Sequence, residues 1–446
     1  TFENIFSRKK MILARLQGAQ KTLQSHHSQF LESLEKQLLF EYDEILHQEK
    51  SLWIMKSRLD YAISDDLNTK FLQTSTLCRR KRNKIVSLRD NEGKWLTNSD
   101  VVKNHILDFF SSLFTSHHSQ SSFYPQNFPF QKSYLEEETK ISLVTLPTIQ
   151  EIKKAVFDLK PLKCPGPDGF HPIFYQKFWN FLAPSITQFI HDAYNQKPLP
   201  VGINDTLICL IPKLDNPDII QQFRPIGLCN TTYKILAKTI VNKLRPILST
   251  IISPLQSSFI SGRSGTDNIM LVQEAIHRLK NKKGKYGLCA IKLDLHKAYD
   301  SLEWSFIHQA PTFFDFPPSL INLILHCITS TNLAILINGS PTNFFSPSRG
   351  IRQGDPLSPY IFIICMEYLS MAITREVDGN NWTPLKFGRS RHCLSHCLFA
   401  DDIILFSRTD DTSITTIQNI PQHFWGPLWP PYQPLQVKDS IFPKHP

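Results

Sequence analysis

The chain has 446 residues, of which 49 are Lys or Arg and 39 are Asp or Glu, so its formal net charge is +10. Its 41% apolar and 20% charged residues are typical of a globular chain of two to four domains and exclude an intrinsically disordered one. The longest nearly unbroken apolar run, 361–373, is shorter than the roughly 20 residues that cross a membrane.

Nine cysteines that never form a C-x-x-C pair exclude a disulfide scaffold and a standard zinc ribbon. The chain begins with Thr, and its first ten residues, TFENIFSRKK, lack the apolar stretch of a secretion signal. We therefore expect a fragment of a longer product in a reduced, intracellular setting, in the nucleus, the cytoplasm or both.

The first region, 1–134, is predicted to be a helical extension. Residues 11–58 indicate a helix, because the apolar residues at 31, 34, 38, 42 and 45 recur every three or four positions. This stripe fits either packing within its own domain or a coiled coil with a partner, and its short length favours the first. Residues 85–96 are predicted to form a β-hairpin with a polar turn at 90–93, and 115–133 a loop or linker.

A basic cluster without an intervening acid lies at residues 79–89. It consists of Arg79, Arg80, Lys81, Arg82, Lys84 and Arg89. Such a cluster is typical of a nuclear-import signal or a solvated face, but it is equally typical of contacts with nucleic-acid phosphates, and both interpretations stay open. The largest share of the net charge lies further on, in 201–300, which carries 14 basic and 7 acidic residues.

The middle of the chain alternates between predicted helices and short β-rich runs. In region 135–205 a helix begins near residue 135, and Thr148 with Glu151 predicts a capping box that opens a second helix at 149–159. In region 206–416 the pattern predicts strands at 206–212 and 287–294, helices at 230–247, 267–281 and 357–377, a hairpin about 338–339 and a strand–turn–strand at 394–407. Seven prolines lie in the last 26 residues, so 417–446 is predicted to be an irregular tail.

The strongest chemical signal is the run LFADDIILF at 398–406. Two adjacent carboxylates between apolar β-prone runs would be costly to bury, whereas a tight turn between paired strands would present them to a metal ion. Neighbouring strand residues point to opposite faces, so Asp401 and Asp402 are expected to have different tasks and a second strand should supply a partner acid. The candidate is Asp294, at the end of LCAIKLD. Such carboxylates suit Mg²⁺, and two ions about 4 Å apart can stabilise an in-line phosphoryl displacement.

Six motifs follow one another in a fixed order. They are KCPGPDGF at 163–170, LIPK at 210–213, FRPIGL at 223–228, KLDLHKAYDSLEW at 292–304, NGSPTNFFSPSRGIRQGDPLSP at 338–359 and FADD at 399–402. This order resembles the reverse transcriptase of plant LINE-type (non-LTR) retrotransposons, from the N-terminal helical region to about residue 416. The segment SLWIMKSRLDYAISDDLNTKF at 51–71 also resembles the region just upstream of the polymerase in those elements.

The resemblance implies an α+β fold with right-hand polymerase fingers and palm in 206–416, where an antiparallel palm sheet is backed by helices. A pre-finger helical region at 135–205 and the α-helical N-terminal extension would precede it. Beyond about residue 416 the resemblance ends, so the thumb is expected to be missing or degenerate, as after a frameshift or in a decayed copy.

The resemblance also implies roles for single residues. Asp294 and Asp401 would be the principal ligands of two Mg²⁺ ions, which Mn²⁺ can replace, and Asp402 the third acid. Tyr299 would lie under the sugar of the incoming nucleotide and favour dNTP over rNTP, although plain core packing explains an aromatic there as well. Arg224, with Lys213, would grip the triphosphate, as bidentate phosphate contacts suit Arg.

The segment RGIRQGDPLSP would form a loop near the nucleotide. Gln353 and Gly354 match the part of it that lies against template and nucleotide, where a glycine allows close backbone approach. Arg349 and Arg352 flank it and either reach backbone phosphates or have a surface role. Asp355 and Pro356 are predicted to open the following helix, with Asp as its cap.

Two further motifs compete for attention. His392, Cys393, His396 and Cys397 have metal-ligand chemistry, but on a strand the two histidines and the two cysteines face opposite sides, so no zinc is expected. The run SGRSG at 261–265 lacks the Gly-Lys-Ser/Thr ending of a phosphate-binding loop and more simply joins a strand to a helix.

The function implied by the resemblance is RNA-directed DNA synthesis, with an RNA template, a DNA primer and dNTP as partners and no membrane. The alternative is a catalytically inactive, truncated remnant that only binds nucleic acid. A two-metal nuclease is a weaker third hypothesis, because it leaves Tyr299, Arg224 and the Gln353–Gly354 loop unexplained.

Overall fold

A computed structural model describes residues 4–57, 69–116, 135–281, 287–295, 297–387 and 393–425, except for the side chains of 294 and 420–425. The chain divides into two compact units. One comprises 1–86 with 212–217, and the other 87–211 with 218–446. This division differs from the four regions expected from the sequence, which stay predictions. None of the helices in the described residues is long and apolar enough to span a membrane.

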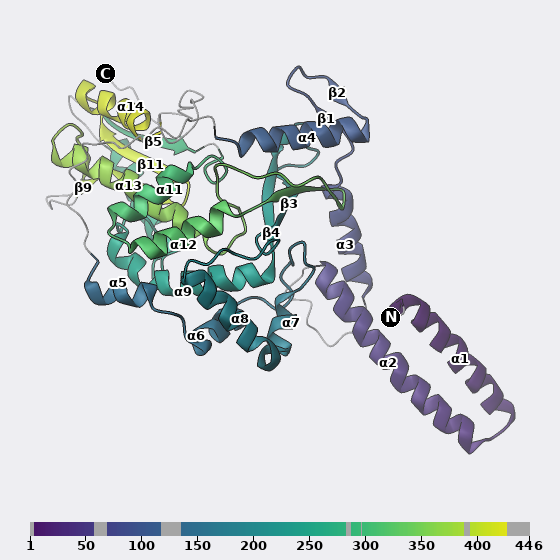
Figure 1. Cartoon of the computed structure of the whole chain (residues 1–446). Helices are drawn as coiled ribbons and strands as arrows, with labels where there is room; N and C mark the ends of the chain where they lie inside the picture. The colour runs from purple at the N-terminus through teal and green to yellow at the C-terminus, as the bar shows by residue number, and fades with distance from the viewer. Residues whose placement is uncertain are drawn as a thin grey trace. The chain divides into compact units, whose positions relative to one another are not determined.

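The first unit contains helices α1 (Ile5–Ser25), α2 (Gln29–Ser57) and α3 (Lys70–Asn83). Helices α1 and α2 lie side by side, and Figure 1 shows them running in opposite directions. The apolar stripe of α2 packs on α1, because Leu38 and Ile45 share a core with Ile12 and Leu16. Packing within the domain is therefore confirmed. The prediction of one helix over 11–58 is wrong, since the polar residues 26–28 separate two helices.

The second unit opens with a small hairpin and a group of helices. Strands β1 (Leu88–Arg89) and β2 (Trp95–Leu96) pair antiparallel, as predicted for 85–96. Helix α4 (Ser99–Leu113) follows. Helices α5 (Glu137–Val144), α6 (Ile149–Phe157), α7 (Pro172–Lys177) and α8 (Trp179–Tyr194) come next. The predicted capping box of α6 is confirmed, because Thr148 and Glu151 each bond the other's backbone N–H.

A four-stranded sheet has the order β4 (Phe223–Cys229), β3 (Thr206–Pro212), β6 (Leu333–Ile337) and β7 (Ser340–Pro341). Strands β3 and β6 are parallel, whereas β6 and β7 form an antiparallel hairpin. Asn338 and Gly339 both have positive φ, 51° and 94°, as a two-residue type I′ turn requires, so the predicted turn is confirmed. The short η1 (Ile220–Gln222) precedes β4, and α9 (Thr231–Ile251) follows it.

A three-stranded antiparallel sheet carries the predicted acids. Its order is β10 (His396–Phe399), β11 (Asp402–Arg408) and β5 (Leu288–Asp294). One face is buried in the main core through Leu293, Leu398, Ile403 and Leu405. That core also contains helices α9, α11 (Trp304–Phe313), α12 (Pro318–Thr329) and α13 (Ser358–Asp378).

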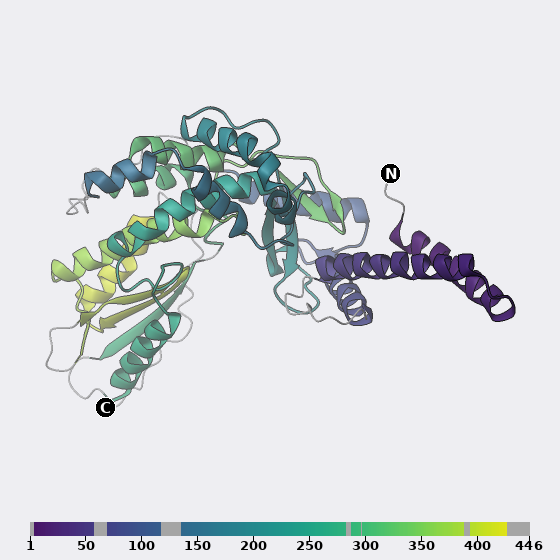
Figure 2. The same ribbon diagram turned by 90° about the horizontal axis from the view of Figure 1, so that it is seen from below.

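The opposite face of this sheet packs against helix α10 (Gly265–Asn281), which Figure 2 shows running along the strands. Phe406 and Cys397 are buried there with Leu279 of α10. A small hairpin of β8 (Leu385–Lys386) and β9 (Cys393–Leu394) completes this second core. The alternation of buried side chains between two faces is the one expected for strands covered on both sides.

Helix α14 (Asp411–Trp425) follows β11 and contacts α13 and β11. The prediction that an irregular tail begins at 417 is therefore wrong, because the helix continues through Pro421. Single prolines also lie inside α8, α9 and α11, so one missing backbone N–H is tolerated where packing supports the helix. The other six prolines of the tail, and with them the expectation of a degenerate thumb, fall in 426–446, outside the described residues.

Candidate active site

Three acids come together at one end of the three-stranded sheet. Phe399 pairs with Asp402, so β10 and β11 are joined by a two-residue turn of Ala400 and Asp401. The backbone of Asp402 is paired with that of Asp294 on β5. Both Asp401 and Asp402 are exposed, while the side chain of Asp294 lies outside the description. The hairpin and its partner strand thus confirm the predicted arrangement at the level of the backbone.

Lys292 supplies a positive charge at this end of the sheet. Its Nζ lies 2.8 Å from Oδ1 of Asp402, and both side chains are 56% exposed. Because Lys292 precedes Asp294 by two strand positions, it stands on the same face of β5. Sequence reasoning missed this ion pair, although the spacing K-x-D on a predicted strand contained the signal.

The donor set fits Mg²⁺. Asp294, Asp401 and Asp402 offer carboxylate oxygens, the ligands that this hard cation prefers, and the two described side chains are open to a hydrated ion. The described residues contain no group of three or more His, Cys, Asp or Glu side chains that could hold a metal ion. They do not include the side chain of Asp294. The fit therefore rests on the chemistry of the donors and on the strand register.

Tyr299 lies beside the turn. Its ring stacks on Phe362 of α13, with centroids 4.5 Å apart and planes at 12°. Burial raises the pKa of the Tyr299 phenol, and the negative charge of Asp401 raises it further, so the hydroxyl is neutral at physiological pH. The packing interpretation of Tyr299 is confirmed. Its role toward a nucleotide stays a prediction.

The loop that contains Gln353 and Gly354 is tied to β4. The backbone N–H of Gly227 donates to the carbonyl of Gln353 at 2.7 Å, and the Gln353 amide donates to the buried Asp300 at 3.2 Å. Gly354 has φ +105°, and a Cβ there would lie 2.9 Å from the carbonyl oxygen of Gly227. Glycine is needed here for close backbone approach, as predicted, and strand β4 is a group that approaches it.

Arg352 is not available for phosphates, which corrects the expectation from sequence. It is only 7% exposed, and its guanidinium group lies over the ring of Tyr233. It donates hydrogen bonds to Asn204 Oδ1, Thr206 Oγ1, the carbonyl of Cys327 and Asp355 Oδ2. These internal partners hold the buried Arg352 in place. The residue therefore connects strand β3, helix α12 and the loop before α13.

Arg349 is also buried, at 4% exposure, so the expectation that it reaches phosphates is wrong as well. Its Nε donates to the carbonyl of Leu113 at 2.8 Å, and its Nη1 lies 3.6 Å from Glu303. The residue thus connects α4 to the segment before α11. Sequence reasoning failed for both arginines because an arginine beside a functional loop does not reveal whether internal oxygens surround it.

The start of α13 also differs from the prediction. The helix begins at Ser358, and the proline in its first turn is Pro359 rather than Pro356. Asp355 does not cap it, because its Oδ2 accepts from Arg352 and from the hydroxyl of Tyr233 at 2.6 Å, and Oδ1 accepts from the N–H of Leu357. The buried charge of Arg352 therefore determines where Asp355 points.

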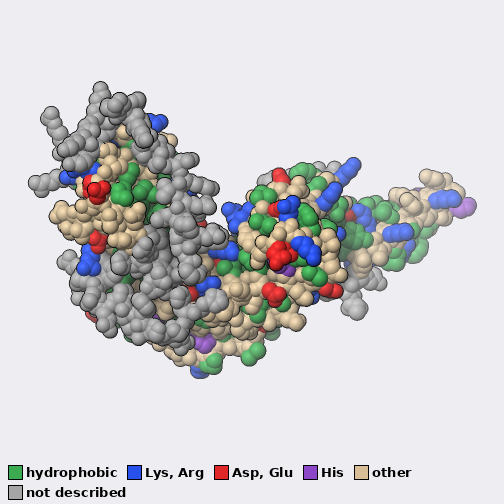
Figure 3. All heavy atoms as spheres, turned by 90° about the horizontal axis from the view of Figure 1, so that it is seen from above, with side chains coloured by type: hydrophobic (Ala, Val, Ile, Leu, Met, Phe, Trp, Pro, Cys, Tyr) green, Lys and Arg blue, Asp and Glu red, His purple; other side chains and the backbone are tan. Residues whose placement is uncertain are grey.

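The remaining basic candidates are distributed over both units. Arg224 is exposed on β4 of the second unit. Lys213 is exposed in the segment 212–217, which belongs to the first unit. In the basic cluster, Arg79 donates to the carbonyls of Lys56 and Ser57 and so closes the end of α2. By contrast, Arg80, Lys81 and Arg82 are exposed at the end of α3, and Arg82 lies 2.8 Å from Asp215. Figure 3 shows Lys and Arg side chains interspersed with Asp and Glu over the described part of one face.

His396 and Cys397 are both buried within the protein. The buried His396 ring is hydrogen-bonded to the hydroxyls of Ser370 and Ser395, and burial lowers its pKa to about 4. Cys397 belongs to the core beneath α10, whereas Cys393 is exposed. His392 lies outside the described residues.

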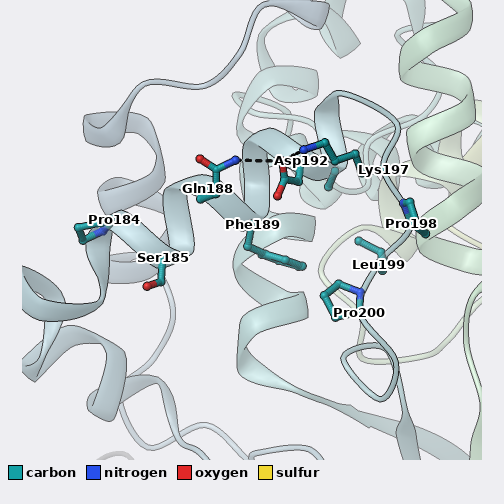
Figure 4. A pocket seen from close by; sticks show the side chains of 10 residues that line it. Pro184, Ser185, Gln188, Phe189, Asp192, Lys197, Pro198, Leu199 and Pro200 are labelled. Atoms are coloured by element: carbon teal, nitrogen blue, oxygen red, sulfur yellow. Dashed lines mark hydrogen bonds and ion pairs between the residues drawn. The ribbon is translucent and has the colours of Figure 1, made fainter.

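A cavity of about 790 Å³ lies between α8 and the segment 197–200. Figure 4 shows that three of its polar side chains interact with one another, since Asp192 accepts from Lys197 at 2.7 Å and from Gln188 at 2.9 Å. The rest of the lining is formed by Ser185, Phe189, Ala193, Leu199 and prolines. It contains none of the residues predicted to carry chemistry.

Comparison with known proteins finds a family match for the segment that carries the acids. Residues 211–424 match the reverse transcriptase (RNA-dependent DNA polymerase) family. This reverse transcriptase segment includes the three-stranded sheet, strands β4, β6 and β7, the FADD turn and α14 as far as residue 424, whereas β3 lies mostly before it. The match implies the palm and fingers of a polymerase and supports an RNA-directed DNA polymerase, which is a nucleotidyltransferase.

Three relatives extend the comparison. The chain is 26% identical over 354 residues to the transposon TX1 uncharacterized 149 kDa protein of Xenopus laevis, over 79% of this chain and 26% of that protein. It is 26% identical over 246 residues to the Pol polyprotein of the type-2 retrotransposable element R2DM of Drosophila melanogaster, over 55% of this chain and 22% of the relative. An uncharacterized mitochondrial protein of Arabidopsis thaliana is 44% identical over 70 residues, 16% of this chain and 57% of that protein.

The chain spans about a quarter of the length of the first two relatives. Both belong to mobile elements, and together with the family match they support a reverse transcriptase of the non-LTR type.

Proposed function

We propose that this chain is the reverse transcriptase region of a plant LINE-type retrotransposon and that it carries out RNA-directed DNA synthesis. A primer 3′-OH attacks the α-phosphate of a dNTP on an RNA template, the new P–O bond forms, and pyrophosphate leaves. The observation that carries the proposal is the strand register that brings Asp294, Asp401 and Asp402 to one end of an antiparallel sheet within the reverse transcriptase segment. The plant origin rests on the order of motifs.

Asp294 and Asp401 would hold two Mg²⁺ ions, or Mn²⁺ in their place. When bound, these ions would lower the pKa of the attacking hydroxyl and neutralise charge on the phosphate. The third acid, Asp402, has its partner in Lys292, whose positive charge balances that of the Asp402 carboxylate. This pairing supports different tasks for the two acids of the turn.

Tyr299 would form the floor of the nucleotide site. Its stacking on Phe362 restricts the ring, so a ribose 2′-OH placed above it would meet a rigid aromatic surface and a deoxyribose would not. Because its phenol stays protonated, it adds no negative charge next to the triphosphate. The Gln353–Gly354 loop lies against β4, and we place template and nucleotide contacts on its exposed side.

The phosphate-binding roles go to exposed basic residues. Arg224 on β4 would contact the triphosphate, where a guanidinium group can bond two oxygens at once. The role of Lys213 toward the triphosphate stays a prediction from the sequence. Arg80, Lys81 and Arg82 would contact the backbone of RNA template or DNA primer. A protein with these partners would act in the nucleus or the cytoplasm.

The test is primer extension on an RNA template with Mg²⁺ and dNTP. Asp401→Ala should lower the rate by more than about 100-fold, since even partners outside the ligand shell typically contribute 10–100-fold. The matched control is Asp378→Ala, an exposed acid at the end of α13, which should keep the rate of the unchanged protein. Equal rates for Asp401→Ala and the unchanged chain would overturn the assignment of the site.

The second candidate is a remnant that binds nucleic acid without catalysis, which the exposed basic residues 80–82 favour. It predicts RNA binding that weakens with salt and is unaffected by Asp401→Ala. A folded protein that binds RNA and extends no primer would support this candidate against the first.

A further inference from the structure

Gln256 lies directly beneath the turn that carries Asp401. It belongs to the segment 252–264 between α9 and α10, and its side chain is fully buried. Its Oε1 accepts a hydrogen bond from the backbone N–H of Ala400 at 3.1 Å and another from the N–H of Ser258 at 3.1 Å. Since both partners are donors, the amide oxygen must face them, which settles the orientation of the amide group.

The backbone around Gln256 is attached to the strand that leads into the turn. The N–H of Leu398 on β10 donates to the carbonyl of Leu255 at 2.9 Å, and the N–H of Ser257 donates to the carbonyl of Leu398 at 3.3 Å. Asn268 of α10 donates to both of these carbonyls, at 3.2 Å and 2.9 Å. The segment thus runs parallel beside Leu398 as an extra edge of the sheet.

Arg263 holds the same segment from the other side. Its guanidinium group donates to the carbonyls of Ser253, Ile252 and Gln256, with distances of 2.5, 2.7 and 2.7 Å. This contact gives the SGRSG run its structural explanation. The main chain that positions the Gln256 side chain is therefore held by both α10 and Arg263.

Ala400 has an unusual backbone. Its φ of 55° lies in the left-handed region, which favours glycine and is unfavourable for alanine. In a two-residue hairpin turn of type II′, only the first residue has positive φ, and for that reason this residue is normally a glycine. The turn therefore needs an interaction that compensates for the conformation of Ala400, and the only hydrogen bond found for its N–H in the described residues goes to Gln256.

The nitrogen of the Gln256 amide, unlike its oxygen, forms no hydrogen bond in the described residues. Its Nε2 is buried and has no hydrogen-bond partner among the described residues. A buried, unpartnered amide N–H group is destabilising, so an apolar side chain would suit the site better if packing were the sole requirement. A glutamine at this position is explained by what its oxygen does for Ala400 and Ser258.

We propose that Gln256 is a positioning residue of the active site. By accepting from the N–H of Ala400 it holds this residue in the left-handed conformation, and the backbone of Ala400 sets the direction in which the next residue, Asp401, presents its carboxylate. Gln256 acts through the turn and does not touch substrate. The catalytic part of this inference rests on the proposed function, whereas the effect on the turn does not.

The test uses the full chain with Gln256→Met, Ala400→Gly and the two combined. Methionine has a similar volume but only a weak acceptor in its thioether sulfur, so Gln256→Met should speed deuterium exchange in the peptide 396–408. It should also raise the Mg²⁺ concentration for half-maximal primer extension by about tenfold or more, as loss of an outer partner does at metal sites. Adding Ala400→Gly should return this concentration to within about threefold of the unchanged protein, because glycine adopts positive φ without the hydrogen bond to Gln256.

The matched control is Gln176→Met on α7. This change also removes a glutamine amide with two hydrogen bonds, to the carbonyls of Val156 and Leu159, at 3.1 and 2.8 Å. It should leave both the exchange of 396–408 and the Mg²⁺ requirement unchanged. A role of Gln256 in overall stability alone would speed exchange across the whole chain rather than in the peptide 396–408.

Unchanged exchange and unchanged Mg²⁺ requirement in Gln256→Met would overturn the inference, as would a defect that Ala400→Gly does not suppress. If Gln256→Met alone does not fold, the comparison is made in the Ala400→Gly background, where removing Gln256 should matter less than about threefold. A larger loss there overturns the inference too. If the unchanged protein extends no primer, the proposed function fails, and exchange of 396–408 still decides whether Gln256 holds the turn.

Discussion

At the scale of single residues, burial separates arginines that look alike in the sequence. The guanidinium group of Arg352 is surrounded by oxygens from Asn204, Thr206, Cys327 and Asp355, while Arg224 stands exposed on β4. A buried cation with matched partners holds the loop before α13 in place. An exposed one is free to meet solvent and phosphate.

Arg352→Ala should therefore lower the free energy of unfolding by about 3–5 kcal/mol, because it leaves Asp355 buried without its cation. Urea unfolding followed by circular dichroism measures this. Arg375→Ala, at an exposed position of α13, is the control and should stay within about 0.5 kcal/mol. Equal losses for the two variants would contradict the structural role of Arg352.

Glu367 of α13 gives a prediction about pH. Burial raises the pKa of its carboxyl to about 8, against the opposing effects of the Ser253 N–H, the charge of Arg263 and the Ser370 hydroxyl. The folded chain thus binds a proton that the unfolded chain has lost, so stability falls as pH rises from about 4.5 to about 8 and then levels off. His396 acts with the opposite sign, but only below about 6.5, where its lowered pKa matters.

Glu367→Gln keeps the shape of the side chain and cannot ionise. Between pH 6.5 and 8, its advantage in unfolding free energy over the unchanged chain should grow by up to about 1.4 kcal/mol per pH unit. Urea unfolding at pH 6.5, 7.5 and 8.5 checks this. A difference that stays constant over that range would show that Glu367 is already ionised in the folded protein.

At the scale of elements, close approaches between segments determine which glycines matter. Gly354 has φ +105° and lies under the carbonyl of Gly227 on β4, whereas Gly18 sits in helix α1 with open space around it. The same substitution should therefore have opposite effects at the two positions.

Gly354→Ala should destabilise the protein by about 1–3 kcal/mol, the usual cost of a left-handed non-glycine residue. Gly18→Ala should stabilise α1 by about 0.5–1 kcal/mol, because alanine loses less backbone entropy on helix formation. Thermal unfolding of the two variants beside the unchanged chain distinguishes the effects. A stabilising Gly354→Ala would mean that the loop does not approach β4 as described.

At the scale of the whole molecule, the positive charge is divided between two units. Most of the net charge falls in 201–300, which contains β3, β4, α9 and α10, but the exposed run Arg80–Arg82 belongs to the other unit. The proposed catalysis and the proposed nucleic-acid contacts of residues 80–82 can therefore be tested by separate substitutions.

Replacing Arg80, Lys81 and Arg82 by alanine should weaken RNA binding and flatten its salt dependence. Each lost phosphate contact lowers the slope of log K against log salt by about 0.7–0.9. The control with the same change of charge replaces Arg15, Lys21 and Lys36, which are exposed on α1 and α2. Filter binding between 50 and 300 mM salt, roughly the range where this slope is measured, separates the two triple variants. Identical slopes would assign the cluster to a solvated face or an import signal.

Much of the fold could be predicted because it depends on local patterns. The strands at 206–212 and 288–294, the capping box at Thr148, the hairpin at Asn338–Gly339 and the FADD turn all follow from periodicity and turn chemistry over a few residues. The two acids of the turn were singled out in the same way, since apolar flanks around Asp401 and Asp402 leave few arrangements for two carboxylates, whereas Asp294 was a candidate from a distant strand. The family match agrees with the order of motifs in this part of the chain.

The sequence by itself therefore determined most of the elements, and the three acids and the type of enzyme that we propose also come from it. Only the tertiary structure decided that the backbone of Asp402 pairs with that of Asp294, that Asp402 forms an ion pair with Lys292, that Arg349 and Arg352 are internal, and that Gln256 lies beneath Ala400. The physical reason is that a local pattern sets which face of an element is apolar, whereas burial of a polar group depends on partners supplied by segments that are distant in the chain. Gln256 is separated from Ala400 by 144 positions, and no spacing rule connects them.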